Sequence, residues 1–234
     1  MVSMLNINFL FQDLDVVWYQ HPLDFFNPRN SFLSNHDIFF QPDGSVQIRY
    51  SPHSANSGFY YVKSNDKTRY LFTSFIYAGD LLWTTHSHQQ VLGQLLAEHC
   101  SLFNLHVKIL NKYDFPGGGE FHRESNYMSK FILQKEKPWI FHMSWTLNKD
   151  DKLKFMKQMG MWYLQNDACE SIERSNHENN NIAMNCCSGT PMISCHYRDK
   201  PSVIPCHDDI PSMDKGALSY WLRNPLLMTH NKAD

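Results

Sequence analysis

Two aspartates, one residue apart, follow a short apolar segment near the beginning of the chain. Residues 9–11 (Phe-Leu-Phe) are apolar and β-prone, which predicts a buried strand that runs out at Asp13 and Asp15. Side chains alternate along an extended chain, so both carboxylates should lie on the same side. Two like charges at such a place are unfavourable unless a cation lies between them, and oxygen ligands suit a divalent cation. The alternative is that both carboxylates are solvated or cap the next segment.

A histidine ends another apolar segment much later in the chain. Residues 137–142 read Lys-Pro-Trp-Ile-Phe-His, which predicts a strand that ends at His142. An imidazole there could complete a metal site begun by the two aspartates, and Lys149 could bind a phosphate. Alternatively, His142 is a core residue whose ring nitrogens are satisfied within the protein.

Polar residues also lie beside two other predicted strands. Asn56 and Gly58 precede the aromatic residues 59–61; an asparagine amide can hydrogen-bond a polyol, and glycine lets a backbone approach closely. Asp37 lies near the start of a strand predicted over residues 34–41. The alternatives are an ordinary turn residue for Asn56 and a solvated carboxylate for Asp37.

The composition is that of a folded protein without a surface for polyanions. The chain has 234 residues, is 42% hydrophobic and carries a net charge of −2, so nucleic acid is not an expected partner. No apolar run is long enough to span a bilayer, and residues 1–10 lack the pattern of a signal peptide. The glycine-rich residues 116–120 lack the Lys-Ser/Thr ending of a P-loop and the spacing of a dinucleotide-binding fingerprint. Two interpretations remain, a loop beside a binding cleft and a plain surface turn.

The remaining periodicity predicts helices and one more strand. Apolar spacing predicts helices over residues 66–78, 87–100 and 152–164, and alternation predicts a strand over residues 104–110. These amphipathic elements pack on a core and carry no functional information.

Five of the six cysteines fall in the last third of the chain, where periodicity is weak. The clustering favours disulfides in an oxidising compartment, with Cys195–Cys206 as one candidate. Zinc is the rival, because His196 and His207 each follow a cysteine, although the spacing fits no common zinc pattern. Free thiols are the third possibility.

In their order and spacing, these segments resemble the nucleotide-diphospho-sugar transferase family. These are retaining glycosyltransferases of the GT-A fold, and they include plant and algal arabinosyl-, xylosyl- and galactosyltransferases. The matching pieces are residues 13–18 (Asp-Leu-Asp-Val-Val-Trp), residues 56–65 and the helix start at residues 89–92. The resemblance covers roughly residues 8–164.

The resemblance implies an α/β fold over residues 1–165, with a GT-A-like mixed sheet flanked by helices. A small irregular Cys-, Pro- and His-rich appendage would follow over residues 166–234. The implied reaction transfers a sugar, with retention, from a nucleotide-sugar donor to a glycan or glycoprotein acceptor in the Golgi lumen of the secretory pathway. Asp13, Asp15 and His142 would hold Mn²⁺ or Mg²⁺ on the donor diphosphate. The implied catalytic residues are Asp13, Asp15 and Gln89. The implied substrate-binding residues are Asn56, Gly58, Gln90, Trp145 and Lys149.

Two features depart from the family pattern. Gln89 stands where the family has an aspartate at a helix start, a position expected near the donor sugar or the acceptor. Only a short segment precedes Asp13, where a GT-A domain has a strand-helix-strand nucleotide-binding half. We therefore expect the chain to lack the N-terminal portion of the domain, which would also supply any membrane anchor. The alternatives are a catalytically inactive fragment or carbohydrate-binding module on the same scaffold and, more distantly, an intracellular metal-binding protein that uses the Cys/His tail.

Overall fold

The computed structural model describes residues 6–27, 33–132, 135–146, 149–158, 161–165 and 186–187 of the chain. The chain forms two compact units, and each is described by itself. The first unit comprises Met1–Ser125 and Lys137–Ser144, and the second comprises Asn126–Glu136 and Trp145–Asp234.

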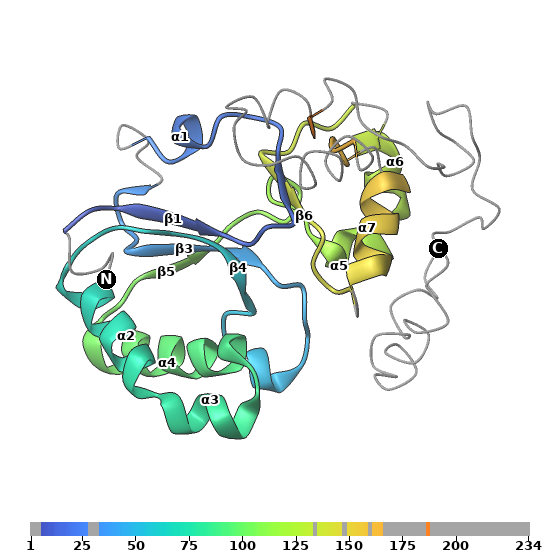
Figure 1. The fold of residues 1–234 in the computed structure, drawn as a ribbon. Coiled ribbons are helices and arrows are strands. Elements are labelled where there is room, and N and C mark those ends of the chain that lie inside the picture. The colour runs from blue at the N-terminus through green and yellow to red at the C-terminus, as the bar shows by residue number, and fades with distance from the viewer. Residues whose placement is uncertain are drawn as a thin grey trace, which may run out of the picture. The chain divides into compact units, whose positions relative to one another are not determined.

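The first unit is an α/β structure (Figure 1). Its strands are β1 (Phe9–Gln12), β2 (Val16–Trp18), β3 (Ile38–Pro42), β4 (Ala55–Val62), β5 (Val107–Ile109) and β6 (Ile140–His142). Its helices are α1 (Pro22–Phe25), the short 3₁₀ helix η3 (Ile48–Tyr50), α2 (Asp66–Tyr77), α3 (Gly79–Thr85), α4 (His88–Phe103) and α5 (Gly118–Arg123).

The larger sheet has the strand order β1-β4-β3-β5. β4 is antiparallel to both of its neighbours, and β5 is parallel to β3, so the sheet is mixed. In this register Gln12 pairs with Phe59, and Pro42 pairs with Ala55. The carboxyl ends of β1 and β3 therefore lie at the same end of the sheet as the beginning of β4.

Helices α2 and α4 cover one face of this sheet, and α3 packs on α4 (Figure 1). Both long helices begin where the sequence predicts, because Asn65 Oδ1 accepts from Thr68 N–H and Ser87 Oγ accepts from Gln90 N–H. The buried residues of the core on this face are Ile38, Phe40, Ala55, Val62, Leu71, Val91, Leu92, Leu95, Leu96 and Leu105. The predicted α/β architecture, a mixed sheet flanked by helices, is confirmed for the described part of the chain.

The other face of the sheet is covered by aromatic side chains. Alternation along β3 and β4 turns Phe39, Phe59 and Tyr61 to this side, where they meet Phe26 and Phe115. Ring pairs of this kind add to area burial, with about 0.5–1.5 kcal/mol for each pair. Leu33, Leu110 and Ile140 complete this second core.

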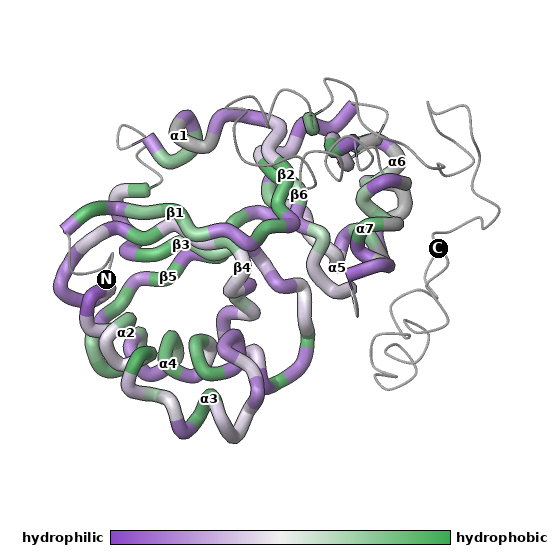
Figure 2. Tube along the Cα trace, in the orientation of Figure 1, coloured by the Kyte–Doolittle hydropathy of each residue, from purple (hydrophilic) through white to green (hydrophobic). Residues whose placement is uncertain are grey.

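A second sheet contains only β2 and β6, which pair antiparallel. Val16 lies opposite His142, and Trp18 lies opposite Ile140. Both strands are largely hydrophobic, as the green colour of β2 and β6 shows in Figure 2. This pairing joins the segment after Asp15 to the segment that carries His142.

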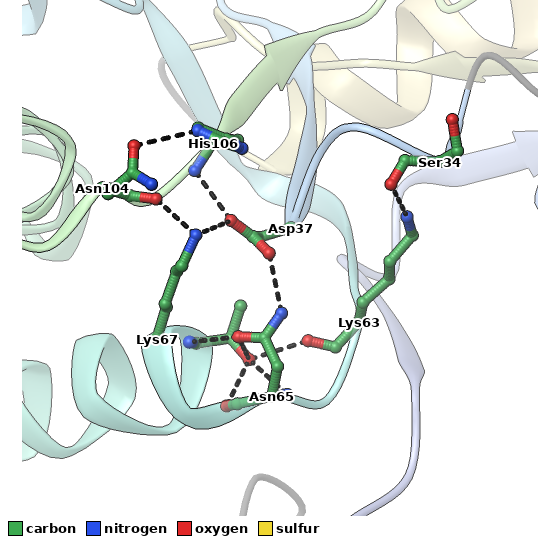
Figure 3. A network of polar contacts seen from close by, with 8 residues as sticks. Ser34, Asp37, Lys63, Asn65, Lys67, Asn104 and His106 are labelled. Carbon is green, nitrogen blue, oxygen red and sulfur yellow. Dashed lines mark hydrogen bonds and ion pairs between the residues drawn. The ribbon is translucent and has the colours of Figure 1, made fainter.

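Asp37 lies in a polar network at the end of the larger sheet where β3 begins (Figure 3). Its carboxylate accepts from Asn65 Nδ2 at 2.8 Å and from His106 N–H at 2.8 Å, and Lys67 Nζ lies 3.6 Å away. The network ties the starts of β3 and α2 to the residues before β5. Asp37 is thus a structural residue at this place, with 15% of its side chain exposed.

The second unit is described by two helices and one bridge. Helix α6 spans Ser125–Ile132, of which Ser125 still belongs to the first unit, and α7 spans Lys149–Gln158. Leu164 pairs with Cys187, and Cys186 is disulfide-bonded, with its partner outside the described residues. The predicted Cys195–Cys206 pair and the zinc alternative also lie outside them. The expected division after residue 165 stays a prediction.

Some elements differ from the expectations at their ends. The strand expected over residues 34–41 begins only at Ile38, and the helix expected over 152–164 spans Lys149–Gln158. Helix α3 was not predicted, and the loop expected over residues 116–120 passes into α5 at Gly118. No helix among the described residues has the length and hydrophobicity needed to cross a membrane.

Candidate metal site

The two aspartates lie in a turn that leads from one sheet to the other. The chain was expected to stay extended here, but β1 ends at Gln12 and β2 begins at Val16. Asp13 N–H donates to Gly58 O at 2.7 Å, which fixes Asp13 to β4 of the larger sheet. Asp15 O accepts from Met143 N–H at 3.1 Å, which continues the β2–β6 ladder and fixes Asp15 beside His142. The turn therefore brings both carboxylates together although the strand does not continue through them.

The side chains of Asp13, Asp15 and His142 converge. His142 Nε2 lies 3.4 Å from Asp15 Oδ1 and 3.9 Å from Asp13 Oδ2. One ligand atom from each residue lies within 4.8 Å of the other two. The distances from His142 Nε2 to the two carboxylates are longer than a normal hydrogen bond. Around one octahedral ion with metal–ligand distances of about 2.1 Å, adjacent ligand atoms lie about 3 Å apart and opposite ones about 4.2 Å apart. The two distances from His142 Nε2 fall in this range.

The three groups differ in their exposure to solvent. The His142 side chain is 3% exposed, Asp15 is 13% exposed and Asp13 is 48% exposed. The imidazole is thus the most buried group of the site, and the Asp13 carboxylate is the one most exposed to solvent. Two carboxylate oxygens and one imidazole nitrogen are a donor set suited to Mn²⁺ or Mg²⁺, so the residues present fit the expected cofactor.

Gly58 leaves room for this arrangement. A Cβ at Gly58 would lie 2.5 Å from Asp13 Oδ2 and 2.6 Å from His142 Cε1. Contacts this short do not occur in relaxed structures, so only glycine allows both side chains to approach β4. The family resemblance implied that Gly58 binds substrate. The structure places Gly58 in close contact with Asp13 and His142, two of the three metal-binding candidates.

Asn56 is buried beside Gly58 and bonded within the protein. Its Oδ1 accepts from Gly58 N–H at 2.7 Å, and its Nδ2 lies 3.4 Å from Asp43 Oδ1. Asn56 thereby supports the segment that carries Gly58. Its predicted contact with the donor sugar stays a prediction.

Gln89 reaches the same segment from the start of α4. Its Oε1 accepts from Ser57 N–H at 3.2 Å and from Ser57 Oγ at 3.3 Å. Gln89 therefore contacts the residue between Asn56 and Gly58, and its predicted place near the donor stays a prediction. Gln90 has its N–H capped by Ser87, and its predicted role in substrate binding stays untested.

Gln41 is a residue of this site that sequence reasoning missed. Its side chain is fully buried at the end of β3, and its Oε1 lies 2.8 Å from His142 Nδ1. Its Nε2 donates to Phe115 O at 3.0 Å and to Pro116 O at 2.8 Å. The available signal was a polar side chain at the end of the apolar segment Ile38–Phe40, which also fits an ordinary strand end.

The loop before α5 closes against His142. His142 N–H donates to Pro116 O at 3.1 Å, and Ser144 Oγ accepts from Gly118 N–H at 3.0 Å. Glu120 Oε2 accepts from Gly117 N–H at 2.9 Å and holds the turn. Burial raises the pKa of the Glu120 carboxyl, against the opposing effect of the Gly117 hydrogen bond.

The charge of Asp13 affects Tyr60 on β4. Burial, and then the negative charge of Asp13, raise the pKa of Tyr60 to about 12. The negative charge of Asp13 therefore affects the ionisation of a tyrosine on the neighbouring strand β4.

Trp145 and Lys149 belong to the second unit. Trp145 adopts a left-handed backbone conformation with φ of 60°, and Lys149 is exposed at the start of α7. Their predicted contacts with substrate stay predictions, because they lie outside the unit that contains the metal site.

Comparisons with known proteins identify a family and a relative. The model of a family described as nucleotide-diphospho-sugar transferase matches residues 1–156. The chain is also 24% identical over 188 residues to UDP-D-xylose:L-fucose alpha-1,3-D-xylosyltransferase 3 of Arabidopsis thaliana, an alignment that covers 71% of this chain and 45% of that protein. The chain thus spans about half the length of the curated relative it matches. No solved structure matches the chain significantly.

Proposed function

This chain belongs to the nucleotide-diphospho-sugar transferase family, and on that premise we propose that it transfers a sugar from a nucleotide-sugar donor to a glycan or glycoprotein acceptor. The family match bears out the resemblance and the GT-A-like α/β fold expected from the sequence. The observation that carries the proposal is the convergence of Asp13, Asp15 and His142 at one end of the larger sheet.

In the proposed reaction, these three residues would hold a divalent cation, which would supply positive charge to stabilise the departing diphosphate. Asp13 and Asp15 would each supply a carboxylate oxygen to the cation, and buried His142 would supply an imidazole nitrogen. Gly58 leaves room for the Asp13 and His142 side chains to approach the β4 backbone. We propose Mn²⁺ or Mg²⁺ as the cation and retention as the stereochemical outcome.

The donor sugar and the compartment are further proposals. The Arabidopsis relative is named for a UDP-xylose donor, so UDP-xylose is the first donor to test. The Golgi lumen is the compartment we propose.

The alternative is a carbohydrate-binding module that keeps the scaffold without transferring sugar. One observation favours this alternative: Gln89 stands where the family pattern has an aspartate. Such a module would bind Mn²⁺ and donor without breaking the sugar–phosphate bond.

The test is release of nucleoside diphosphate from a panel of nucleotide-sugars by the purified chain, with MnCl₂ and with EDTA. We expect Mn²⁺-dependent release by the wild type and its loss in Asp15→Asn. Asp66→Asn is the control, because Asp66 lies on α2 with a side chain 97% exposed. Equal rates for the wild type and Asp15→Asn would overturn the catalytic proposal, whereas Mn²⁺-dependent donor binding without release would support the binding module.

A further inference from the structure

Gln41 contacts the histidine of the metal site through the nitrogen that does not face the carboxylates. Its Oε1 lies 2.8 Å from His142 Nδ1, while His142 Nε2 faces Asp15 and Asp13. The Gln41 side chain is fully buried, so no solvent competes for the contact. Both ring nitrogens of His142 thus have defined and different surroundings.

The orientation of the Gln41 amide follows from its other two contacts. Phe115 O and Pro116 O lie 3.0 and 2.8 Å from Gln41 Nε2, and a carbonyl oxygen can only accept a hydrogen bond. The amide nitrogen must therefore face these carbonyls, which leaves Oε1 to face His142. Because Oε1 only accepts, the hydrogen of the neutral imidazole must be on Nδ1.

We propose that Gln41 is a positioning residue that holds His142 in the Nδ1–H tautomer and thereby directs the Nε2 lone pair at the cation. This inference rests on the metal site of the proposed function. Gln41 touches neither the cation nor the substrate and acts only through His142. Histidine ligands generally donate their second N–H to an acceptor, which fixes both tautomer and ring orientation.

The chemistry of the site explains why this residue is a glutamine. A glutamate could also accept from His142 Nδ1–H, but its second oxygen would face the carbonyls of Phe115 and Pro116 without a hydrogen to donate. An apolar residue would remove a hydrogen-bond partner from the Phe115 and Pro116 carbonyls and from the Nδ1–H in a buried place. Only a neutral group with one acceptor and two donors satisfies all three neighbours.

A purely structural role for Gln41 is the alternative, because the same amide fixes the loop at Phe115 and Pro116. The chain offers a matched control for that role. Gln20 Nε2 likewise donates to two successive carbonyls, Lys137 O at 2.7 Å and Pro138 O at 3.2 Å. Within the described part of the chain, these bonds do not involve His142.

The experiment compares Gln41→Met with Gln20→Met in two measurements. Long-range ¹H–¹⁵N spectra of the metal-free protein report the His142 tautomer, with the signals assigned by their absence in His142→Ala. Titration with MnCl₂, followed by electron paramagnetic resonance, reports the affinity for the ion. We expect an Nδ1–H tautomer in the wild type, its loss in Gln41→Met and Mn²⁺ binding weaker by about 10- to 100-fold. Gln20→Met should change neither.

An Nε2–H tautomer in the wild type would overturn the inference, and so would unchanged tautomer and affinity in Gln41→Met. If Gln41→Met does not fold, the wild-type tautomer still decides. If the wild type binds no Mn²⁺, the proposed function loses its metal site, while the tautomer of His142 still tests the role of Gln41 separately.

Discussion

Gly58 lies so close to Asp13 that a methyl group on Gly58 would meet Asp13 Oδ2 at 2.5 Å. The same methyl group would meet the ring of His142 at 2.6 Å, so one backbone position limits two of the three residues that converge on the proposed cation. The geometry of the site is thus determined by the backbone of β4 as well as by the acidic residues.

Replacement of Gly58 by alanine should disrupt the site more than the fold. The added Cβ must push Asp13 and His142 apart, and overpacking of this kind destabilises by about 1–3 kcal/mol. We expect Gly58→Ala to abolish Mn²⁺ binding measured by calorimetry and to lower the melting temperature. Gly93→Ala is the control: apart from its chain neighbours and the adjacent backbone of α4, no atom lies within 4 Å of the added Cβ. This substitution should therefore stabilise the fold by about 0.5–1 kcal/mol. Normal Mn²⁺ affinity in Gly58→Ala would show that the close approach is unimportant.

Mn²⁺ should stabilise the wild type and leave Asp15→Asn unaffected. A ligand that binds only the folded state stabilises it by about 2.7 kcal/mol at 100 times its dissociation constant. Without the ion, Asp15→Asn relieves repulsion between two close carboxylates, so its melting temperature should equal or exceed that of the wild type. Thermal unfolding with and without MnCl₂ checks both points. An equal Mn²⁺-induced shift in the two proteins would exclude Asp15 as a ligand.

Glu120 should make the fold less stable as the pH rises. Burial raises its pKa in the folded state above the value in the unfolded chain, so its contribution is fully present below the unfolded pKa and is lost as the pH rises through the folded pKa. Glu120→Gln cannot ionise and escapes this loss. The melting temperature of Glu120→Gln relative to the wild type should therefore increase between about pH 4 and pH 8, whatever its offset at low pH. Glu98→Gln, on the exposed side of α4, should follow the wild type; a flat difference for Glu120→Gln would contradict the burial argument.

Asp37 should matter for stability and not for the metal. Asp37→Ala leaves the Asn65 amide and the His106 N–H without their acceptor, and such a loss costs about 1–3 kcal/mol (Figure 3). Because the network lies at the other end of β3 from the metal site, Mn²⁺ affinity should not change. Urea unfolding and Mn²⁺ titration measure the two quantities. Asp66→Ala provides the exposed comparison and should stay within about 0.5 kcal/mol of the wild type. Weakened Mn²⁺ binding in Asp37→Ala would refute the separation.

The three residues that converge at the metal site could be predicted from their types and local setting. Asp13 and Asp15 follow one apolar strand and His142 ends another, and their chemistry made a shared cation one hypothesis beside solvated carboxylates and a core histidine. The path of the chain between the aspartates could not be predicted in this way. The turn there depends on the pairing of Val16 with His142, which joins two segments far apart in the sequence and leaves no local periodic signal.

Gln41 could not be predicted either, because its contacts also join segments far apart in the sequence. Its role depends on three partners, Phe115, Pro116 and His142, and none of them is a sequence neighbour. Local patterns predict roughly where helices begin and which faces are buried, as they did for the helices expected over residues 66–78 and 87–100. They do not specify which buried polar groups will meet.

The shared cation is tested most directly by anomalous diffraction from crystals of the chain grown with MnCl₂. One manganese peak is expected within about 2.0–2.6 Å of Asp13, Asp15 and His142 Nε2, and the peak should be absent in crystals of Asp15→Asn. Ordered side chains with manganese bound elsewhere, or with Asp15 turned away from His142, would contradict the metal site on which the proposed sugar transfer depends.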